Sequence, residues 1–113
     1  MIRMRIAVPT IGNRKLSNKV ADTFSRAPNF TLVSIQDNKI KSVKVIRNPG
    51  EILDRGAGPL VARALVDNNV DIVLTEDMGP GARNILEILD IQINLVEKGK
   101  RVKEVLSPYL ESK

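Results

Sequence analysis

DIVLTEDMGPGA, residues 71–82, is the stretch that decides the fold class of this 113-residue chain. Its first part, from Asp71 to Thr75, is a short apolar run that predicts a buried strand. Gly79 and Pro80 follow, and they mark a turn into the start of a helix. Apolar side chains then recur at helical spacing, at Ala82, Ile85, Leu86 and Leu89. A strand that leads directly into a helix indicates an α/β fold.

The alternation of helix and strand continues on both sides of this stretch. A preceding helix is predicted by the apolar stripe Ala57, Leu60, Val61, Ala64 and Leu65. A following strand is predicted over Ile91–Val96, and a third helical stripe comes after it at Val102, Val105, Leu106 and Tyr109. Pro108 should kink or end that last helix near Ser107, because proline has no backbone N–H to donate.

The N-terminal half of the chain is richer in β-forming residues. Arg5–Pro9 predicts a short strand, and residues 10–28 are polar enough to predict a loop with room for one helical turn. Phe30–Ile35 and Ile40–Ile46 predict two strands, and the Asp37-Asn38-Lys39 segment between them suits a tight hairpin turn. The whole order predicts a mixed five-stranded sheet with helices covering its faces.

Length and composition indicate one globular domain over residues 1–113. Apolar residues make up 42% of the chain and charged residues 27%, which is typical of a folded protein and not of a disordered one. No stretch approaches the roughly 18 apolar residues that a membrane span needs. The first ten residues lack the layout of a signal peptide, so we expect a cytoplasmic protein with no membrane association.

The chain contains neither cysteine nor histidine. These absences exclude a thiolate nucleophile, a cysteine-ligated zinc or iron–sulfur site, and the usual general base at neutral pH. Glu76 and Asp77 are the acidic candidates, but neighbouring residues on an extended segment point apart. The first strand supplies no carboxylate, so we expect no metal-dependent hydrolysis, no catalytic residue and no metal site.

Charge is spread unevenly along the chain. The net charge of +5 combines +8 over residues 1–50 with −3 over residues 51–113. A basic half is typical of an anionic ligand or partner, and it is also typical of an ordinary solvated surface. Aromatic residues are few (Phe24, Phe30 and Tyr109), which argues against binding of single-stranded nucleic acid by base stacking.

Two glycine–proline segments stand directly before predicted helices, Gly56-Ala57-Gly58-Pro59 and Gly79-Pro80-Gly81-Ala82. Each would expose backbone N–H groups and the positive end of a helix dipole to an anion. The simpler interpretation is a helix start after a tight turn. The second segment follows a strand that ends at Thr75, and ligands of open α/β sheets bind beyond such strand ends. Neither segment is a Walker A or GxGxxG motif.

The order of these motifs resembles a known family. It runs Ala7-Val8-Pro9, Phe24-Ser25-Arg26-Ala27-Pro28, Asn48-Pro49, Gly56-Ala57-Gly58-Pro59 and Gly79-Pro80-Gly81-Ala82. The resemblance is to the dinitrogenase iron–molybdenum cofactor-binding domain of the NifB/NifX type, and it covers nearly the whole chain. It implies a ribonuclease H-like fold, a five-stranded mixed sheet flanked by helices. It also implies a role in carrying or assembling iron–sulfur–molybdenum cofactor precursors.

This chain departs from the family pattern at three places. Thr23-Phe24-Ser25-Arg26 stands where the family often has His-Phe-Gly-Arg, and Arg55 stands where it often has histidine before Gly-Ala-Gly-Pro. Asp77-Met78 replaces a glycine pair. The soft and imidazole ligands of a metal cluster are therefore missing, and an iron–molybdenum or iron–sulfur cluster as cofactor is implied by the resemblance alone.

The leading hypothesis is a non-catalytic binding module for an anionic small molecule or a preformed cluster. Arg26 is either a surface charge or a planar donor to that anion, and Arg55 has the same two interpretations. The candidate binding residues are Thr10, Arg26, Arg55, Gly56, Gly58, Thr75, Gly79 and Gly81. The alternatives are a protein-interaction or adaptor domain with a vestigial pocket and, more weakly, a nucleic-acid binder that uses the basic half.

Overall fold

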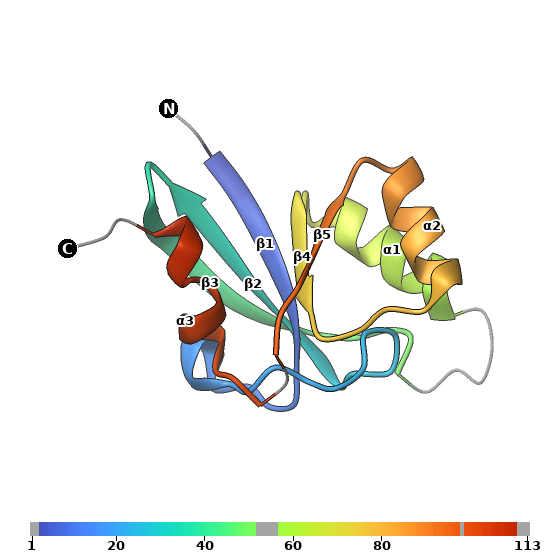
Figure 1. Cartoon of the computed structure of the whole chain (residues 1–113), viewed down its shortest axis with the longest axis horizontal. Helices are drawn as coiled ribbons and strands as arrows, with labels where there is room; N and C mark the ends of the chain where they lie inside the picture. Colours follow the sequence, from blue (N-terminus) through green and yellow to red (C-terminus); the bar gives the residue numbers. More distant parts are fainter. Residues whose placement is uncertain (1–2, 52–56, 98, 111–113) are drawn as a thin grey trace.

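Five strands form one mixed sheet in the order β3-β2-β1-β4-β5 in the computed structural model, which describes residues 3–51, 57–97 and 99–110 (Figure 1). The strands are β1 (Arg3–Thr10), β2 (Asn29–Gln36), β3 (Lys39–Arg47), β4 (Ile72–Thr75) and β5 (Gln92–Leu95). The α-helices are α1 (Ala57–Asp67), α2 (Pro80–Ile88) and α3 (Val102–Val105). Two short 3-10 turns accompany them, η1 (Lys15–Ser17) and η2 (Ser107–Tyr109).

The predicted hairpin is confirmed. β2 and β3 are antiparallel, and the turn between them places Asp37 at φ 54° and Asn38 at φ 65°. Two successive left-handed residues are what a tight two-residue hairpin turn requires, and aspartate and asparagine tolerate this conformation well. β1 then pairs antiparallel with β2 and parallel with β4, and β4 pairs parallel with β5. The predicted mixed sheet is therefore correct.

Two elements differ in extent from the sequence-based prediction. The first strand begins at Arg3, because its backbone pairs with β2 along its whole length, although its first side chains are polar. The last helix is shorter than its apolar stripe, since α3 ends at Val105 and Tyr109 belongs to the following 3-10 turn. Pro108 lies within that turn and ends the helical register, as its missing N–H predicts.

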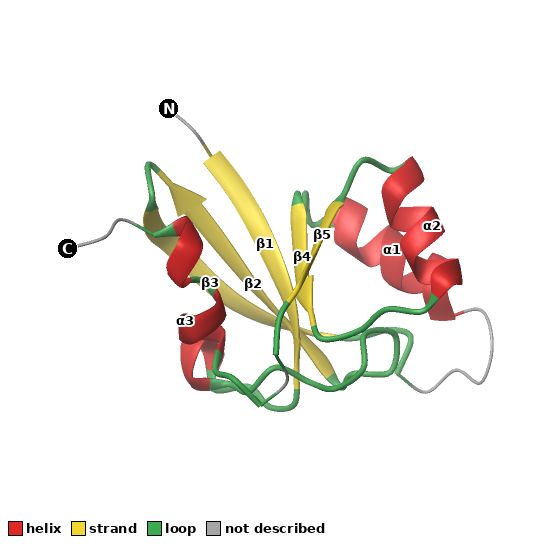
Figure 2. Ribbon diagram, in the orientation of Figure 1, coloured by secondary structure: helices red, strands yellow, loops and turns green. Residues whose placement is uncertain are grey.

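Helices cover both faces of the sheet (Figure 2). On one face α1 and α2 pack together against β1, β2 and β4, and the 22–28 segment joins this layer through Phe24. The opposite face carries α3 and the 18–20 segment, with a separate apolar cluster that includes Ile6, Val33 and Val102. Alternate residues of β1 serve the two clusters, Ala7 on one face and Ile6 and Val8 on the other.

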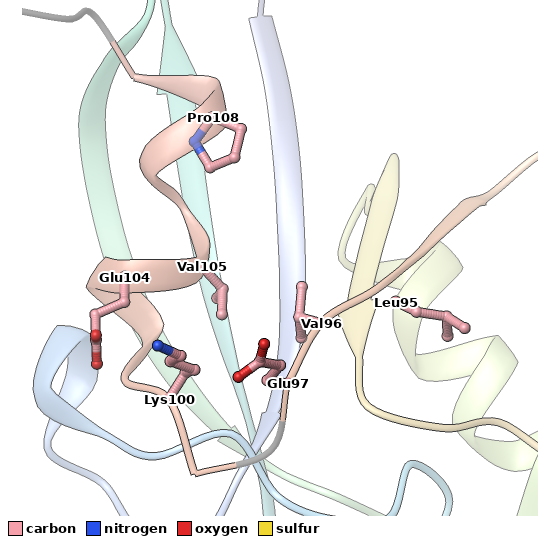
Figure 3. A pocket seen from close by; sticks show the side chains of 7 residues that line it. All are labelled: Leu95, Val96, Glu97, Lys100, Glu104, Val105 and Pro108. Atoms are coloured by element: carbon pink, nitrogen blue, oxygen red, sulfur yellow. The ribbon is translucent and has the colours of Figure 1, made fainter.

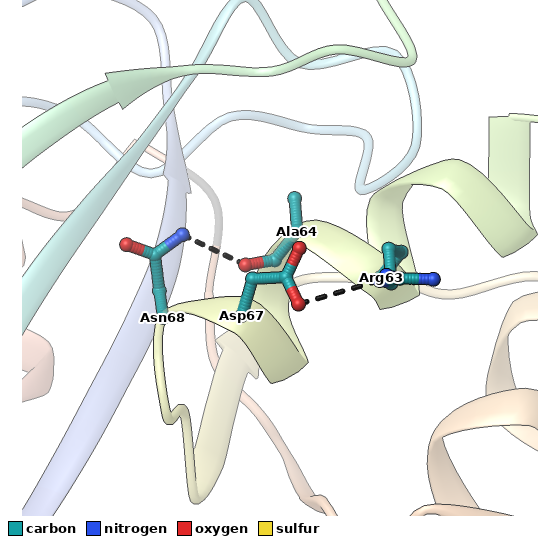
Figure 4. Close-up of polar contacts among 4 residues, drawn as sticks. All are labelled: Arg63, Ala64, Asp67 and Asn68. Atoms are coloured by element: carbon teal, nitrogen blue, oxygen red, sulfur yellow. Dashed lines mark hydrogen bonds and ion pairs between the residues drawn. The ribbon is translucent and has the colours of Figure 1, made fainter.

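Polar and charged side chains lie at the edge of the sheet and at the end of α1. β3 and β5 are the edges of the sheet, and β3 exposes Lys39, Lys41, Lys44 and Arg47. At the end of α1, Asn68 donates its side-chain amide to the carbonyl of Ala64, and Arg63 forms an exposed ion pair with Asp67 (Figure 4). Within the described ranges, no helix combines the length and apolar character that a membrane crossing needs.

Candidate functional site

A cleft of about 230 Å³ lies between the 22–26 segment and the loop that joins β4 to α2. It opens on the face of the sheet that carries α1 and α2, because Phe24 and Met78 belong to that apolar cluster. The lining residues are Asp22, Thr23, Phe24, Ser25, Arg26, Asp77, Met78 and Gly79. The cleft therefore joins the Phe-x-Arg segment to the second glycine–proline segment.

Two buried contacts hold the first wall of the cleft in place. The ring of Phe24 packs edge-on against Phe30 of β2, with ring centroids 5.4 Å apart and planes inclined by 61°. Asn48, which follows β3, donates its side-chain amide to the carbonyls of Ser25 at 2.9 Å and Ala27 at 2.8 Å. Arg26 lies between these two carbonyls, so Asn48 fixes the backbone that presents it.

The second wall is the turn from β4 into α2. Thr75 donates its hydroxyl to the carbonyl of Asp77, and the Asp77 carboxylate accepts the backbone N–H of Met78 at 2.8 Å. Gly79 precedes the helix in an extended conformation, and Pro80 occupies its first turn. No side chain caps the start of α2 in the described part of the chain, so its first N–H groups are available to a ligand.

Of the predicted site residues that the structure describes, Arg26 and Gly79 line this cleft, and Thr10, Gly58, Thr75 and Gly81 do not. Thr10 and Thr75 are fully buried, and Thr10 shares a hydrogen bond with Thr31 at 2.9 Å. The hydroxyl of Thr75 is engaged within the protein as well, because it donates to the carbonyl of Asp77.

Gly58 and Gly81 lie inside α1 and α2 and not in loops. A Cβ atom at Gly58 would lie 3.6 Å from Ile85, so Gly58 belongs to the contact between the two helices. Gly81 is exposed, with open space around its missing side chain. Arg55 and Gly56, the remaining candidates, lie outside the described residues.

The cleft carries charges of both signs. Asp22 and Asp77 contribute exposed carboxylates to its lining, and Arg26 contributes an exposed guanidinium. The described residues contain no group of three or more potential metal-binding side chains. Because the chain has no cysteine or histidine, the side chains of this cleft do not fit direct ligation of an iron–molybdenum or iron–sulfur cluster.

A larger hollow, of about 560 Å³, lies between the end of β5 and α3 (Figure 3). It contains none of the predicted site residues. Its lining is mixed, with apolar side chains around Glu97, Lys100 and Glu104. A surface of this composition provides no convergent set of donors for an anion, so the Arg26 cleft is the better candidate despite its smaller volume.

Asn48 supports the cleft from behind, and sequence analysis misses this structural role. In the sequence, the Asn48-Pro49 motif indicates only the end of a strand. The side chain is 3% exposed and also accepts the backbone N–H of Gly50, so its amide is fully used. The one signal in the sequence is an asparagine directly before proline, but its partners lie 21 and 23 residues away in the chain.

Comparison with known proteins gives a consistent result. The family model described as dinitrogenase iron–molybdenum cofactor matches residues 4–112. An uncharacterised protein of Methanocaldococcus jannaschii, MJ0580, is 26% identical over 110 residues, which span 97% of this chain and 88% of that protein. The apo form of the orange protein from Desulfovibrio gigas superposes with a TM-score of 0.84 at 26% identity, covering 94% of this chain and 86% of that one.

A Thermotoga protein assigned provisionally as NifB has the same fold. It superposes with a TM-score of 0.77 at 27% identity, over 94% of this chain and 86% of its own. These matches extend over nearly the whole chain.

Proposed function

The chain belongs to the dinitrogenase iron–molybdenum cofactor family, and on that basis we propose that it is a non-catalytic, single-domain binding module for an anionic ligand. The ligand is a small molecule or a preformed metal cluster, and it is held at the Arg26 cleft. The family name indicates the class of ligand. The charged and hydrogen-bonding groups of this chain would hold that ligand.

One observation carries the proposal: Arg26 and the uncapped start of α2 border the same cleft. A helix N-terminus favours an anion by about 0.3–1 kcal/mol, and a charge-assisted hydrogen bond from arginine contributes about 1.5–3 kcal/mol. Asn48 fixes the backbone on both sides of Arg26, so less conformational freedom is lost when a ligand binds. The exposed carboxylates of Asp22 and Asp77 weaken the attraction for an anion without cancelling it, and they can accept hydrogen bonds from donor groups that the ligand also carries.

A cluster carried here would need a complete set of its own ligands. Thiolate and imidazole are absent from the whole chain, so no protein side chain can replace a lost sulfur or nitrogen ligand. The orange protein was characterised in an apo form, a term for a protein without the group that it binds. That relative supports a carrier role for the fold.

The strand order supports the ribonuclease H-like assignment of this fold. The side chains of the described residues argue against nuclease activity. A central strand flanked by an antiparallel hairpin on one side and parallel strands on the other is the arrangement that the assignment implies. A nuclease of this type needs convergent carboxylates for two metal ions. β1 carries none, and the described residues form no acidic cluster of three.

Equilibrium dialysis against tetrathiomolybdate, molybdate and sulfate tests the proposed site. We expect the wild type to retain at least one of these anions and the Arg26→Ala variant to retain less. Arg63→Ala is the matched control, because Arg63 is an exposed arginine on α1 away from the cleft. Equal retention by all three proteins, or no retention by the wild type, would refute the proposal.

A second candidate is the adaptor domain, and a specific surface favours it. An apolar groove of about 450 Å³ runs between α1 and α2, and two of the residues that line it, Val66 and Leu89, each expose 43% of their surface. Apolar side chains gathered on one helix pair are typical of protein contacts. A partner recovered from host lysate by the wild type and lost in Leu89→Lys would support this role. Recovery that is insensitive to that change would exclude this groove as the contact surface.

A further inference from the structure

A second cleft, of about 370 Å³, opens on the opposite face of the sheet from the Arg26 cleft. It lies beside the end of β1, on the face that carries α3. Three cations line it, Arg14, Lys19 and Arg101, and none of the described residues that line it is acidic. The described residues place no carboxylate in an ion pair with any of these three side chains.

Two of these cations are forced together by the backbone. Val20 donates its N–H to the carbonyl of Lys100 at 2.8 Å, and Val102 donates to the carbonyl of Asn18 at 2.8 Å. Lys19 and Arg101 therefore stand directly opposite each other in an antiparallel bridge. Side chains at opposed positions project to the same side, and like charges there repel each other.

Hydrogen bonds also fix the conformation of the loop over residues 12–19, which carries two of the three cations. Asn18 is 3% exposed, and its side-chain oxygen accepts the N–H of Arg14 at 2.9 Å. Its amide donates to the carbonyl of Gly12 at 2.7 Å, and Asn29 donates to the same carbonyl at 3.1 Å. Arg101 donates to the carbonyl of Ser17 at 2.8 Å. The backbone at Arg14 and the guanidinium of Arg101 are thus held in place within the protein, which lowers the entropy lost on binding.

We propose that this cleft binds the phosphate groups of a small phosphorylated compound. Arginine and lysine that converge in a cleft without an acidic lining residue are the donors that a multiply charged oxyanion requires, and the nearby Glu104 carboxylate is engaged by the backbone N–H of Arg101. The volume is within the usual range of small-molecule sites, about 300–1,000 Å³, and exceeds what a single phosphate ion fills. No aromatic residue lines the cleft, so it offers no platform for the bases of single-stranded nucleic acid. An anion also removes the repulsion between Lys19 and Arg101.

Isothermal titration calorimetry at low ionic strength, with inorganic pyrophosphate and ATP as probes, tests the proposal. The cleft variant is Lys19→Gln combined with Arg101→Gln, and both side chains are exposed, so we expect it to fold. The control is Lys41→Gln combined with Lys103→Gln, which removes the same net charge from exposed positions outside the cleft. We expect about tenfold or greater loss of affinity in the cleft variant and a far smaller loss in the control.

Three results would contradict the proposal, and each points to a different explanation. Arg26→Ala should leave pyrophosphate affinity unchanged, and a loss as large as that of the cleft variant would place the phosphate in the other cleft and overturn the proposal. Equal loss in the control variant would show attraction to net charge alone and would also overturn it. Tighter binding of an RNA oligonucleotide or a DNA duplex than of both small probes, lost in the cleft variant, would replace the small compound with nucleic acid.

Discussion

The side-chain amide of Asn48 lies 2.8 Å from the carbonyl oxygen of Ala27, and this contact joins the end of β3 to the segment that presents Arg26. The same amide also donates to Ser25. A buried asparagine with both donors and its acceptor satisfied acts as a clamp, because any movement of the loop breaks more than one hydrogen bond.

Asn48→Ala should therefore lower the free energy of unfolding by about 2–4 kcal/mol, since it leaves one buried and one partly buried carbonyl without this donor. Urea denaturation followed by circular dichroism measures this change. Asn84→Ala is the control, because Asn84 is an exposed asparagine on α2 and its loss should change stability by less than about 0.5 kcal/mol. An equal, small effect of both substitutions would contradict the clamp.

Phe24→Ala should remove a buried ring and its edge contact with Phe30, at a cost of about 3–5 kcal/mol. Phe24→Leu, which keeps most of the apolar volume, should cost clearly less. Thermal unfolding of both variants measures the difference. A Phe24→Ala protein as stable as the wild type would mean that the cleft wall does not depend on this packing.

Substitution by alanine should lower the stability of the protein at Gly50 and hardly change it at Gly79. A Cβ atom at Gly50 would lie 2.7 Å from a Val61 methyl and 3.2 Å from the Cβ of Ala57, whereas one at Gly79 would meet nothing within 4 Å. Neither glycine has a positive φ, so packing alone decides. We expect Gly50→Ala to lose about 1–3 kcal/mol of stability and Gly79→Ala to lose little. Chemical denaturation of the two variants compares them directly.

Gly81→Ala should raise the stability of the protein and weaken its binding of the ligand. Gly81 is an exposed helical residue with open space around it, so alanine should stabilise the protein by about 0.5–1 kcal/mol through its higher helix propensity. If the start of α2 receives a ligand at close range, the same methyl group should weaken retention of the anions in the dialysis experiment. A more stable variant with unchanged retention would remove Gly81 from the proposed site.

Lys19→Gln should stabilise the ligand-free protein at low ionic strength by about 0.2–1 kcal/mol, because it relieves the repulsion with Arg101. The gain should shrink as salt screens the two charges. Melting temperatures measured across a sodium chloride series detect this trend. Lys103→Gln, which removes an exposed cation outside the bridge, should show no comparable dependence on salt.

The protein should not retain zinc or other transition metals after dialysis against a chelator. It has no cysteine or histidine, and oxygen ligands alone suit magnesium or calcium better. Elemental analysis of the dialysed protein gives the answer. Stoichiometric zinc would require a site made of carboxylates, and the described residues hold no cluster of three.

Local chemistry predicted the fold well. Asp37 and Asn38 predicted the hairpin because they tolerate the left-handed backbone of a tight turn, which needs no information from elsewhere in the chain. The apolar stripes predicted the helices because each buries one side against the sheet. Only the extents were inexact, since β1 begins at Arg3, where pairing with β2 outweighs the polar side chains.

The arrangement of the candidate residues was predicted only in part, because it depends on contacts between distant segments. The structure brings Arg26 and Gly79 to one cleft, and their role in binding stays a prediction. Thr10 was expected to face the ligand, but its direction follows from the strand pleat, which turns it toward Thr31. The roles of Asn18 and Asn48 arise from partners that only the folded chain brings near.

The charged outer strand of the sheet has a consequence for solubility at high concentration. An edge strand offers unpaired backbone donors and acceptors to the edge of another molecule, and this is the usual first step toward fibrils. β3 meets that hazard with Lys39, Lys41, Lys44 and Arg47, whose charges would be brought together if two such edges paired. At the other edge, β5 has only four residues, too few to hold a second sheet in register. The fold thus discourages uncontrolled polymerisation at both of its open borders.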